Sequence, residues 1–273
     1  MKKLIVTADD FGLSLPVNEA VDLAHQHGIL TAASLMMGAP ARDDAVERAR
    51  KLPRLGVGLH LTLVDSCPVL PPTEVPGLVG QDGRFSTDPV KFGTALFFSK
   101  DLRRQAEAEI TAQFDAFRKT GLTMDHINGH QHFHMHPAIS KIIARLAKDV
   151  GNPPVRIPVE PLFPSYTATS DRFRDRLSGW VFFYAQSRLL RRRVRAAGLG
   201  VNDRVFGLND SGAMTETRVL QFLDKLPNGT TEFSFHPATR RWPGVDNLPD
   251  DYRPMEEFAA LTSLNVKGKA NAL

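Results

Sequence analysis

Short apolar runs alternate with amphipathic stretches along the first third of the chain. The runs at 3–8, 30–38 and 56–64 predict buried strands, because a strand covered on both faces is apolar throughout. The stretches at 16–27 and 41–52 have apolar residues at helical spacing and predict helices. Strand–helix units in succession are typical of parallel strands joined by right-handed crossovers.

The alternation resumes after residues 65–99, which are rich in Pro, Gly and Asp and have no clear period. A loop of this length is usually a lid or a binding loop. The next helix is expected from Asp101, as its N-cap, to Gly121. Further along, the pattern predicts a strand at 124–130, a helix at 137–151, strands at 155–158 and 204–208, a helix at 215–226 and a strand at 231–237. Between 159 and 200 the regularity fails, and we expect an insertion that contains one amphipathic helix.

Seven strands alternating with helices predict an α/β fold, a TIM-like (β/α) barrel formed by a single domain over residues 1–273. The pattern leaves open whether the seven-stranded barrel closes completely. In such barrels the chemistry lies at the C-terminal ends of the strands. Polar residues at those ends are therefore the candidates for a functional site.

Composition narrows the class of protein. A chain of 273 residues with 42% apolar residues can bury a large core. Its single cysteine, Cys67, excludes an internal disulfide framework and a cysteine zinc cluster. The start MKKLIVTADD has too short an apolar run for a secretory signal, and no segment approaches the roughly 18 apolar residues of a spanning helix. We therefore expect a cytoplasmic protein.

Positive charge is concentrated in one segment. The net charge is +4, and much of the excess lies in SRLLRRRVRAAG at 187–198. A basic patch could meet nucleic acid, a membrane surface or an acidic partner, or it could be a solvated helix face. Nucleic acid is disfavoured, because the basic residues are not interleaved with aromatic stacking platforms along several strands.

Acidic residues and histidines gather at the predicted strand ends. Asp9 and Asp10 follow the first strand, His60 lies within the third, and His130 and His236 end the strands at 124–130 and 231–237. Taken singly, the carboxylates could be turn formers or helix caps, and His60 a core histidine. Their shared position at one rim of the barrel favours a common site.

Histidine is concentrated between residues 126 and 136, which hold five of the nine histidines in the chain. His130, His132, His134 and His136 are spaced by two, so on an extended backbone they would point to one side. Burying four imidazoles without partners is costly, and neutral imidazole is the commonest metal ligand. Since one open metal site needs about three protein ligands, we expect one or two of these histidines to bind metal.

Four motifs resemble those of the YdjC-like carbohydrate deacetylases and occur in the same order: TADDFGLS, GLHLTL, DHINGHQHFHMHP and TEFSFHPAT. The resemblance spans essentially the whole chain. It is closest to the branch of hopanoid-biosynthesis-associated deacetylases, which share the segments HGILTAASLM, PVLPP and RVFGLNDSGAMTE. The wider family usually has H-[IL]-D-S-H where this chain has HINGH, so Asn128 and Gly129 replace Asp and Ser. That difference removes a carboxylate beside the ligands but removes no ligand.

The resemblance implies that Asp10, His60 and His130 hold one divalent metal ion and that Asp9 is the general base. A carboxylate with two imidazoles suits zinc, whereas a largely oxygen and water shell would suit magnesium or manganese. From the chemistry, His236 is placed to protonate the leaving nitrogen of an amide, its alternative being an ordinary strand-end histidine before a proline.

Other residues have supporting roles in this hypothesis. His132 and His134 would orient the ligands or contact substrate. Arg156 could brace Asp9 or contact substrate, or it could be a surface charge.

The closest branch implies removal of acetyl from an N-acetylglucosamine attached to a bacteriohopane polyol, a lipid-linked substrate. Residues 180–195 combine aromatic and arginine residues as interfacial helices do, although a buried-face helix with a basic outer side is the alternative. Two other functions stay open: a deacetylase of soluble chitin-like oligosaccharides, and a metal-binding or nucleic-acid-binding protein without catalysis. A homodimer is possible.

Overall fold

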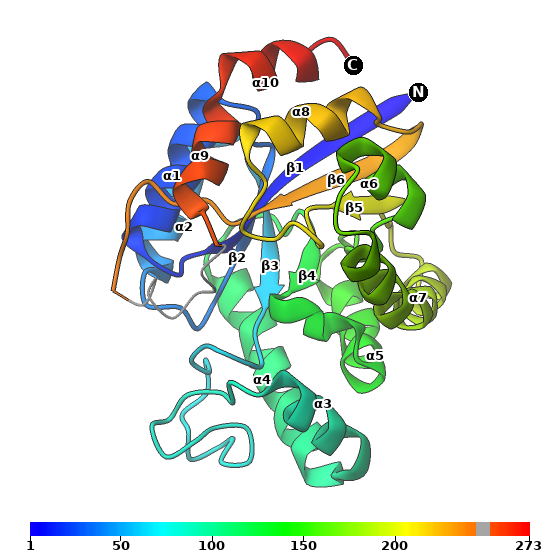
Figure 1. Ribbon diagram of the computed structural model, residues 1–273. Helices are drawn as coiled ribbons and strands as arrows, with labels where there is room; N and C mark the ends of the chain where they lie inside the picture. Colours follow the sequence, from blue (N-terminus) through cyan, green and yellow to red (C-terminus); the bar gives the residue numbers. More distant parts are fainter. Residues whose placement is uncertain (244–251) are drawn as a thin grey trace.

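A curled, parallel β-sheet runs through the centre of the protein (Figure 1). The computed structural model describes residues 1–243 and 252–273. Within these residues the sheet has six strands in the order β4-β3-β2-β1-β6-β5. The strands are β1 (Lys2–Phe11), β2 (Ala32–Leu35), β3 (Gly56–Leu61), β4 (Ile127–Gly129), β5 (Arg204–Phe206) and β6 (Gly229–Phe235). The α/β architecture with parallel strands is thus confirmed.

The expectation of seven strands is wrong in one place, the segment 155–158. Val155 makes only single parallel bridges, to Ile127 on β4 and to Val201 before β5. Prolines at 153, 154 and 158 have no N–H groups, so this segment cannot extend a ladder of hydrogen bonds. The sheet therefore stays open between its edge strands β4 and β5.

Helices cover the sheet and connect its strands (Figure 1). They are α1 (Leu15–His27), α2 (Arg42–Lys51), α3 (Pro89–Phe98), α4 (Lys100–Lys119), α5 (Pro137–Leu146), α6 (Leu162–Thr169), α7 (Phe173–Ala196), α8 (Glu216–Asp224), α9 (Pro254–Thr262) and α10 (Leu264–Ala270), with 3₁₀ turns at His130–Met135 and Ala147–Val150. Among the described residues, no helix has the length and apolar character needed to cross a bilayer.

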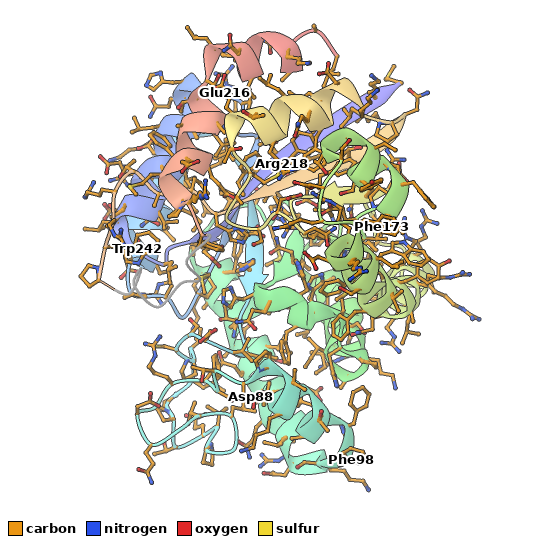
Figure 2. All side chains as sticks on the ribbon, in the orientation of Figure 1. Asp88, Phe98, Phe173, Glu216, Arg218 and Trp242 are labelled. Atoms are coloured by element: carbon orange, nitrogen blue, oxygen red, sulfur yellow. The ribbon has the colours of Figure 1, made fainter. Side chains whose placement is uncertain are left out.

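Three helical details differ from the sequence-based expectations. Ser99, and not Asp101, caps α4: its hydroxyl accepts from the backbone N–H of Leu102 at 3.1 Å, while Asp101 pairs with Arg104 one turn further along. The region 65–99 contains α3, and Phe98 at its end is 83% exposed and lies at the tip of the molecule farthest from α10 (Figure 2). The region 159–200 contains two helices, α6 and α7, where one was expected.

Burial along β1 shows where the core and the site lie. Its first residues are largely exposed, whereas Val6 to Phe11 are buried. On one side of the sheet, Phe206, Phe222 and Phe233 pack ring against ring, with 4.7 Å between the centroids of the first two. The buried C-terminal end of β1 thus carries Asp9 and Asp10 to the middle of the sheet, beside β2 and β6.

Candidate metal and catalytic site

The strand-end residues meet in one open cleft of about 1330 Å³. Asp9 and Asp10 come from the end of β1, His60 from β3, His130 from the residue after β4, and His236 from the residue after β6. All five line the cleft. The structure thus brings together every residue that the strand-end argument selected, as parallel strands with aligned C-terminal ends require.

A local irregularity of the backbone lets the side chains of Asp9 and Asp10 both approach His60. Adjacent residues of a regular strand point to opposite faces. Here Asp10 has a φ of +61°, in the left-handed region that non-glycine residues seldom adopt, and the register with β2 shifts at this point. As a result, Oδ1 of Asp9 lies 4.0 Å from Nδ1 of His60, and Oδ1 of Asp10 lies 3.2 Å from Nε2 of the same ring.

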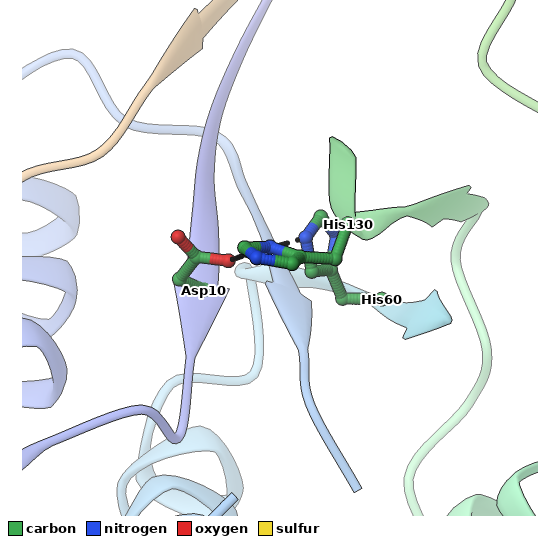
Figure 3. A group of neighbouring side chains, drawn as sticks. All are labelled: Asp10, His60 and His130. Carbon is green, nitrogen blue, oxygen red and sulfur yellow. Dashed lines mark hydrogen bonds and ion pairs between the residues drawn. The ribbon is translucent and has the colours of Figure 1, made fainter. Parts of the chain in front are cut away.

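Asp10, His60 and His130 form a group that could hold a metal ion (Figure 3). Oδ1 of Asp10 lies 3.2 Å from Nε2 of His60 and 3.0 Å from Nδ1 of His130, and the three ligand atoms all lie within 4.8 Å of one another. Metal–ligand bonds of about 2.0–2.2 Å place neighbouring ligands roughly 3 Å apart, so these donors fit one ion. Burial alone would raise the pKa of Asp10, but the two histidines hold that pKa well below its usual range.

Asn128 sets the orientation of His60. The Nδ1–H of His60 donates to Oδ1 of Asn128 at 2.7 Å, which leaves Nε2 with its lone pair toward Asp10. The amide nitrogen of Asn128 donates to Asp9 at 3.0 Å and to Ser34 at 2.8 Å, which fixes the direction of the amide. An aspartate in this place would put another negative charge against Asp9, whereas asparagine supplies one acceptor and two donors.

Asp9 is enclosed by donors. Arg156 forms a bidentate ion pair with it, and Ser34 and Ser234 donate hydroxyl hydrogens to its two oxygens at 2.9 and 3.0 Å. Burial alone would raise the pKa of Asp9, but the Arg156 guanidinium holds that pKa well below its usual range. Asp9 is therefore ionised at neutral pH, and Arg156 is a buried brace and not a surface charge.

Arg156 has a second carboxylate partner. Its Nε and Nη2 donate to Oε1 of Glu232 at 2.9 and 2.7 Å, and Glu232 also accepts from the hydroxyl of Thr7 at 2.8 Å. The sequence reasoning did not select Glu232 or Ser234. The sequence signal that could have identified them is the alternation in TEFSFH. On a strand, this alternation places Glu232, Ser234 and His236 on one side and the phenylalanines on the other.

The expectation that His130, His132, His134 and His136 share one side is wrong. The strand ends at Gly129, and φ is +47° at Gln131 and +58° at His132, so the chain turns away. His130 alone joins the metal group.

The other three histidines have separate surroundings. His134 donates from Nε2 to the carbonyl of Arg156 at 2.9 Å, and burial lowers its pKa to about 3. His136 caps α5. His132 lines the cleft with its ring 5.6 Å from that of Phe183, and its Nδ1 has no hydrogen-bond partner among the described residues.

His236 lines the same cleft and comes from the end of β6, the strand next to β1. Its Nδ1 is 3.4 Å from the hydroxyl of Ser211, and its ring centroid is 5.6 Å from that of Tyr252. Burial lowers the pKa of His236, against the opposing effect of Asp10 and Asp9. The imidazole is thus aimed into the cleft by groups that the sequence alone did not indicate.

Known proteins resemble this chain in sequence and in fold. Residues 3–272 match the sequence profile of the YdjC-like protein family. A carbohydrate deacetylase of Brevibacillus brevis is 38% identical over 176 residues, 64% of each chain, and one of Geobacillus stearothermophilus is 30% identical over 94% of this chain and 88% of its own. A solved Enterococcus faecalis V583 protein, named for cellobiose-phosphate cleavage, is 26% identical, with a TM-score of 0.72 over 99% of this chain and 94% of its own. Because this match covers nearly the whole length of the chain, the chain belongs to the YdjC-like protein family.

Proposed function

We propose that the protein is a metal-dependent hydrolase that removes the acetyl group from an N-acetylated amino sugar. The observation that carries this proposal is the Asp10–His60–His130 group, with ionised Asp9 beside it, in the lining of a cleft large enough for a carbohydrate. Two relatives bear the name carbohydrate deacetylase, which supports the same substrate class.

A divalent ion held by Asp10, His60 and His130 would acidify water and polarise the acetyl carbonyl. Asp9 then accepts the proton of the attacking water. Because Arg156 keeps the pKa of Asp9 low, Asp9 gives that proton up again, and the departing nitrogen is where the reaction needs one. His236, which lines the same cleft, donates a proton to the departing nitrogen and is reprotonated by the proton that Asp9 took from the water, while His132 contacts the substrate. We infer zinc or magnesium as the ion, since two imidazoles favour zinc and the carboxylate accepts either.

Elemental analysis of purified variants tests the ligand set. His60→Ala and His130→Ala should lose the ion and all acetate release from an N-acetylglucosaminide, because each removes one of three protein ligands. His132→Ala is the matched control from the same turn and should keep at least part of the metal. Full metal occupancy in His130→Ala would show that another histidine is the ligand. A parent chain that binds metal but releases no acetate would be a metal-binding protein without catalysis.

A leaving-group comparison tests His236. An amide nitrogen must be protonated to depart, whereas a 4-nitrophenolate leaves without a proton. His236→Ala should therefore lose more activity on the N-acetylglucosaminide than on 4-nitrophenyl acetate. Equal losses on the two substrates would remove His236 from the role of proton donor.

We further propose N-acetylglucosaminyl bacteriohopanetetrol as the substrate, taken at the inner face of the cytoplasmic membrane. Helix α7 supports this: Val181 and Phe182 are 60% and 63% exposed, and Arg188, Arg192 and Arg195 are exposed further along the same helix. Apolar and basic side chains together on one exposed helix suit an anionic lipid surface.

Other residues of the same segment serve the fold. Arg191 donates to the carbonyl of Asp203 and Arg193 to that of Pro137. Variants that test membrane binding should leave these two arginines in place.

Vesicle flotation separates a lipid-linked substrate from soluble chitin-like oligosaccharides. Replacing Arg188, Arg192 and Arg195 by Gln should weaken binding to anionic vesicles, since each Arg contributes on the order of 1 kcal/mol near such a surface. Acetate release from a soluble N-acetylglucosaminide should stay unchanged. If the triple variant floats with the vesicles as well as the parent does, the soluble substrate is favoured.

A further inference from the structure

We propose that Glu257 is a positioning residue for His236, so that helix α9 holds the proton donor of the cleft in place. This inference rests on the proposed deacetylase function. Glu257 lies 21 residues beyond His236 in the sequence, and none of the motifs includes it.

The Glu257 carboxylate joins two segments that wall the cleft. Its side chain is fully buried. Oε2 accepts from the backbone N–H of His236, and Oε1 accepts from the backbone N–H of Met214 at 3.0 Å. The N–H of His236 lies one residue beyond the end of β6, and the carboxylate accepts it there in place of a ladder partner.

The same carboxylate fixes the surroundings of the imidazole. The loop that carries Met214 also carries Ser211, whose hydroxyl lies 3.4 Å from Nδ1 of His236. Gly212, with φ +75°, packs so closely against Tyr252 that a Cβ there would clash with its ring. Tyr252 in turn packs against His236. A shift of either segment held by Glu257 would therefore move the imidazole relative to its neighbours.

Glutamate is needed at position 257 because both of its side-chain oxygens accept a backbone N–H. Burial raises the pKa of Glu257 to about 8, and the ionised carboxylate can accept an N–H at each oxygen. The amide of Gln would direct its own N–H₂ group against one of the two backbone donors at every pH. Glu257→Gln keeps the size of the side chain but leaves one buried N–H without an acceptor.

A matched control exists within the chain. Glu109 on α4 is also fully buried, and its oxygens accept from the backbone N–H groups of Val69 and Leu70 at 2.9 and 3.0 Å. Glu109→Gln therefore removes the same kind of contact from a segment that does not hold His236. Both variants should lose thermal stability to a similar extent.

The test compares acetate release from an N-acetylglucosaminide with that from 4-nitrophenyl acetate in metal-loaded parent and variants. Glu257→Gln should keep the metal content of the parent, lose at least about tenfold on the amide, as a small misplacement of a reacting group does, and lose much less on the ester. Glu109→Gln should change the two rates by the same factor. Ser211→Ala, at an exposed position, should reproduce the selective loss on the amide if Glu257→Gln fails to fold.

Two outcomes overturn the inference. Equal losses on amide and ester in Glu257→Gln or Ser211→Ala, with an active parent, would make Glu257 a structural residue only and leave the proposed function intact. A parent that releases acetate from neither substrate would overturn the proposed function, and this inference with it.

Discussion

Two arginines of this protein are buried between carboxylates in nearly the same way. Arg156, 3% exposed, lies between Asp9 and Glu232 inside the curl of the sheet. Arg176, 0% exposed, is ion-paired on α7 to Glu160, Asp171 and Asp210. In both groups the pKa of the guanidinium is raised by the carboxylates, against the lowering effect of burial.

The surroundings separate the two groups. Asp9 faces the cleft beside three potential metal ligands. The Arg176 group joins α7 to the loop after β5, where Glu160 accepts from the backbone N–H groups of Leu208 and Asn209. A buried ion pair with shifted pKa values is thus no sufficient sign of catalysis, since structural networks shift pKa values too. What distinguishes Asp9 is its position near the C-terminal end of β1, where it lines the cleft.

The largest expected effect contrasts one aspartate from each group. Asp9→Asn should retain the metal and lose about 10²–10⁴ in turnover, because the attacking water has no proton acceptor. Asp210→Asn should leave turnover close to that of the parent, because Asp210 contacts Arg176 and not the cleft ligands. Acetate release with metal analysis measures both, and comparable losses of turnover would contradict the distinction.

Stability should not distinguish the two groups. Arg156→Met and Arg176→Met each leave buried carboxylates without their cation, which costs about 3–5 kcal/mol. The exposed pair of Arg145 and Glu107 is the control, and Arg145→Met should cost at most about 1 kcal/mol. Urea unfolding gives the three values, and only Arg156→Met should also lose activity in the folded state. A stable Arg176→Met would mean that the second group is not required for the fold.

The smallest expected effect is a difference in acid sensitivity. Burial lowers the pKa of His134 to about 3, so below its ordinary pKa near 6.5 the unfolded chain takes up a proton that the folded chain cannot. Stability from neutral His134 is thus present above pH 6.5 and is lost as the pH falls toward 3. Thermal unfolding between pH 7 and 4.5 should show a shallower decline for His134→Gln than for the parent.

The Arg176 group provides the contrast in the same measurement. It contains no histidine, and its arginine partners hold the pKa of Asp171 below the ordinary value although burial opposes them. The contribution of Asp171 is therefore retained down to about pH 4, the ordinary pKa of an aspartate, and is lost only below it. Arg176→Met removes the cation from the carboxylates of this group and so raises their pKa values, which makes the exposed control Arg145→Met the matched comparison. Arg145→Met should parallel the parent between pH 7 and 4.5, and a flattened curve for it would contradict the role given to His134.

The sequence by itself determined the strand ends and the residues that meet there. Asp9, Asp10, His60 and His236 were selected because the period of a strand and the end of an apolar run are local properties. Parallel strands then bring their C-terminal ends to one rim without any further information. The helix at 137–151 was visible for the same local reason, with the exact end of its last turn left to the structure.

Only the tertiary structure decided which partners these residues have. His130 precedes the turn at Gln131 and His132 and lies in the metal group, whereas the histidines after the turn lie elsewhere. The positive φ at these two residues ends the alternation that a strand would have had. Prolines at 153, 154 and 158 interrupt the segment that was expected as the seventh strand, because a continuous ladder needs N–H donors at the positions they occupy. The pairing of Asp9 with Arg156, 147 residues later, and of His236 with Glu257 depends on contacts between separate elements, for which a single chain carries no local pattern.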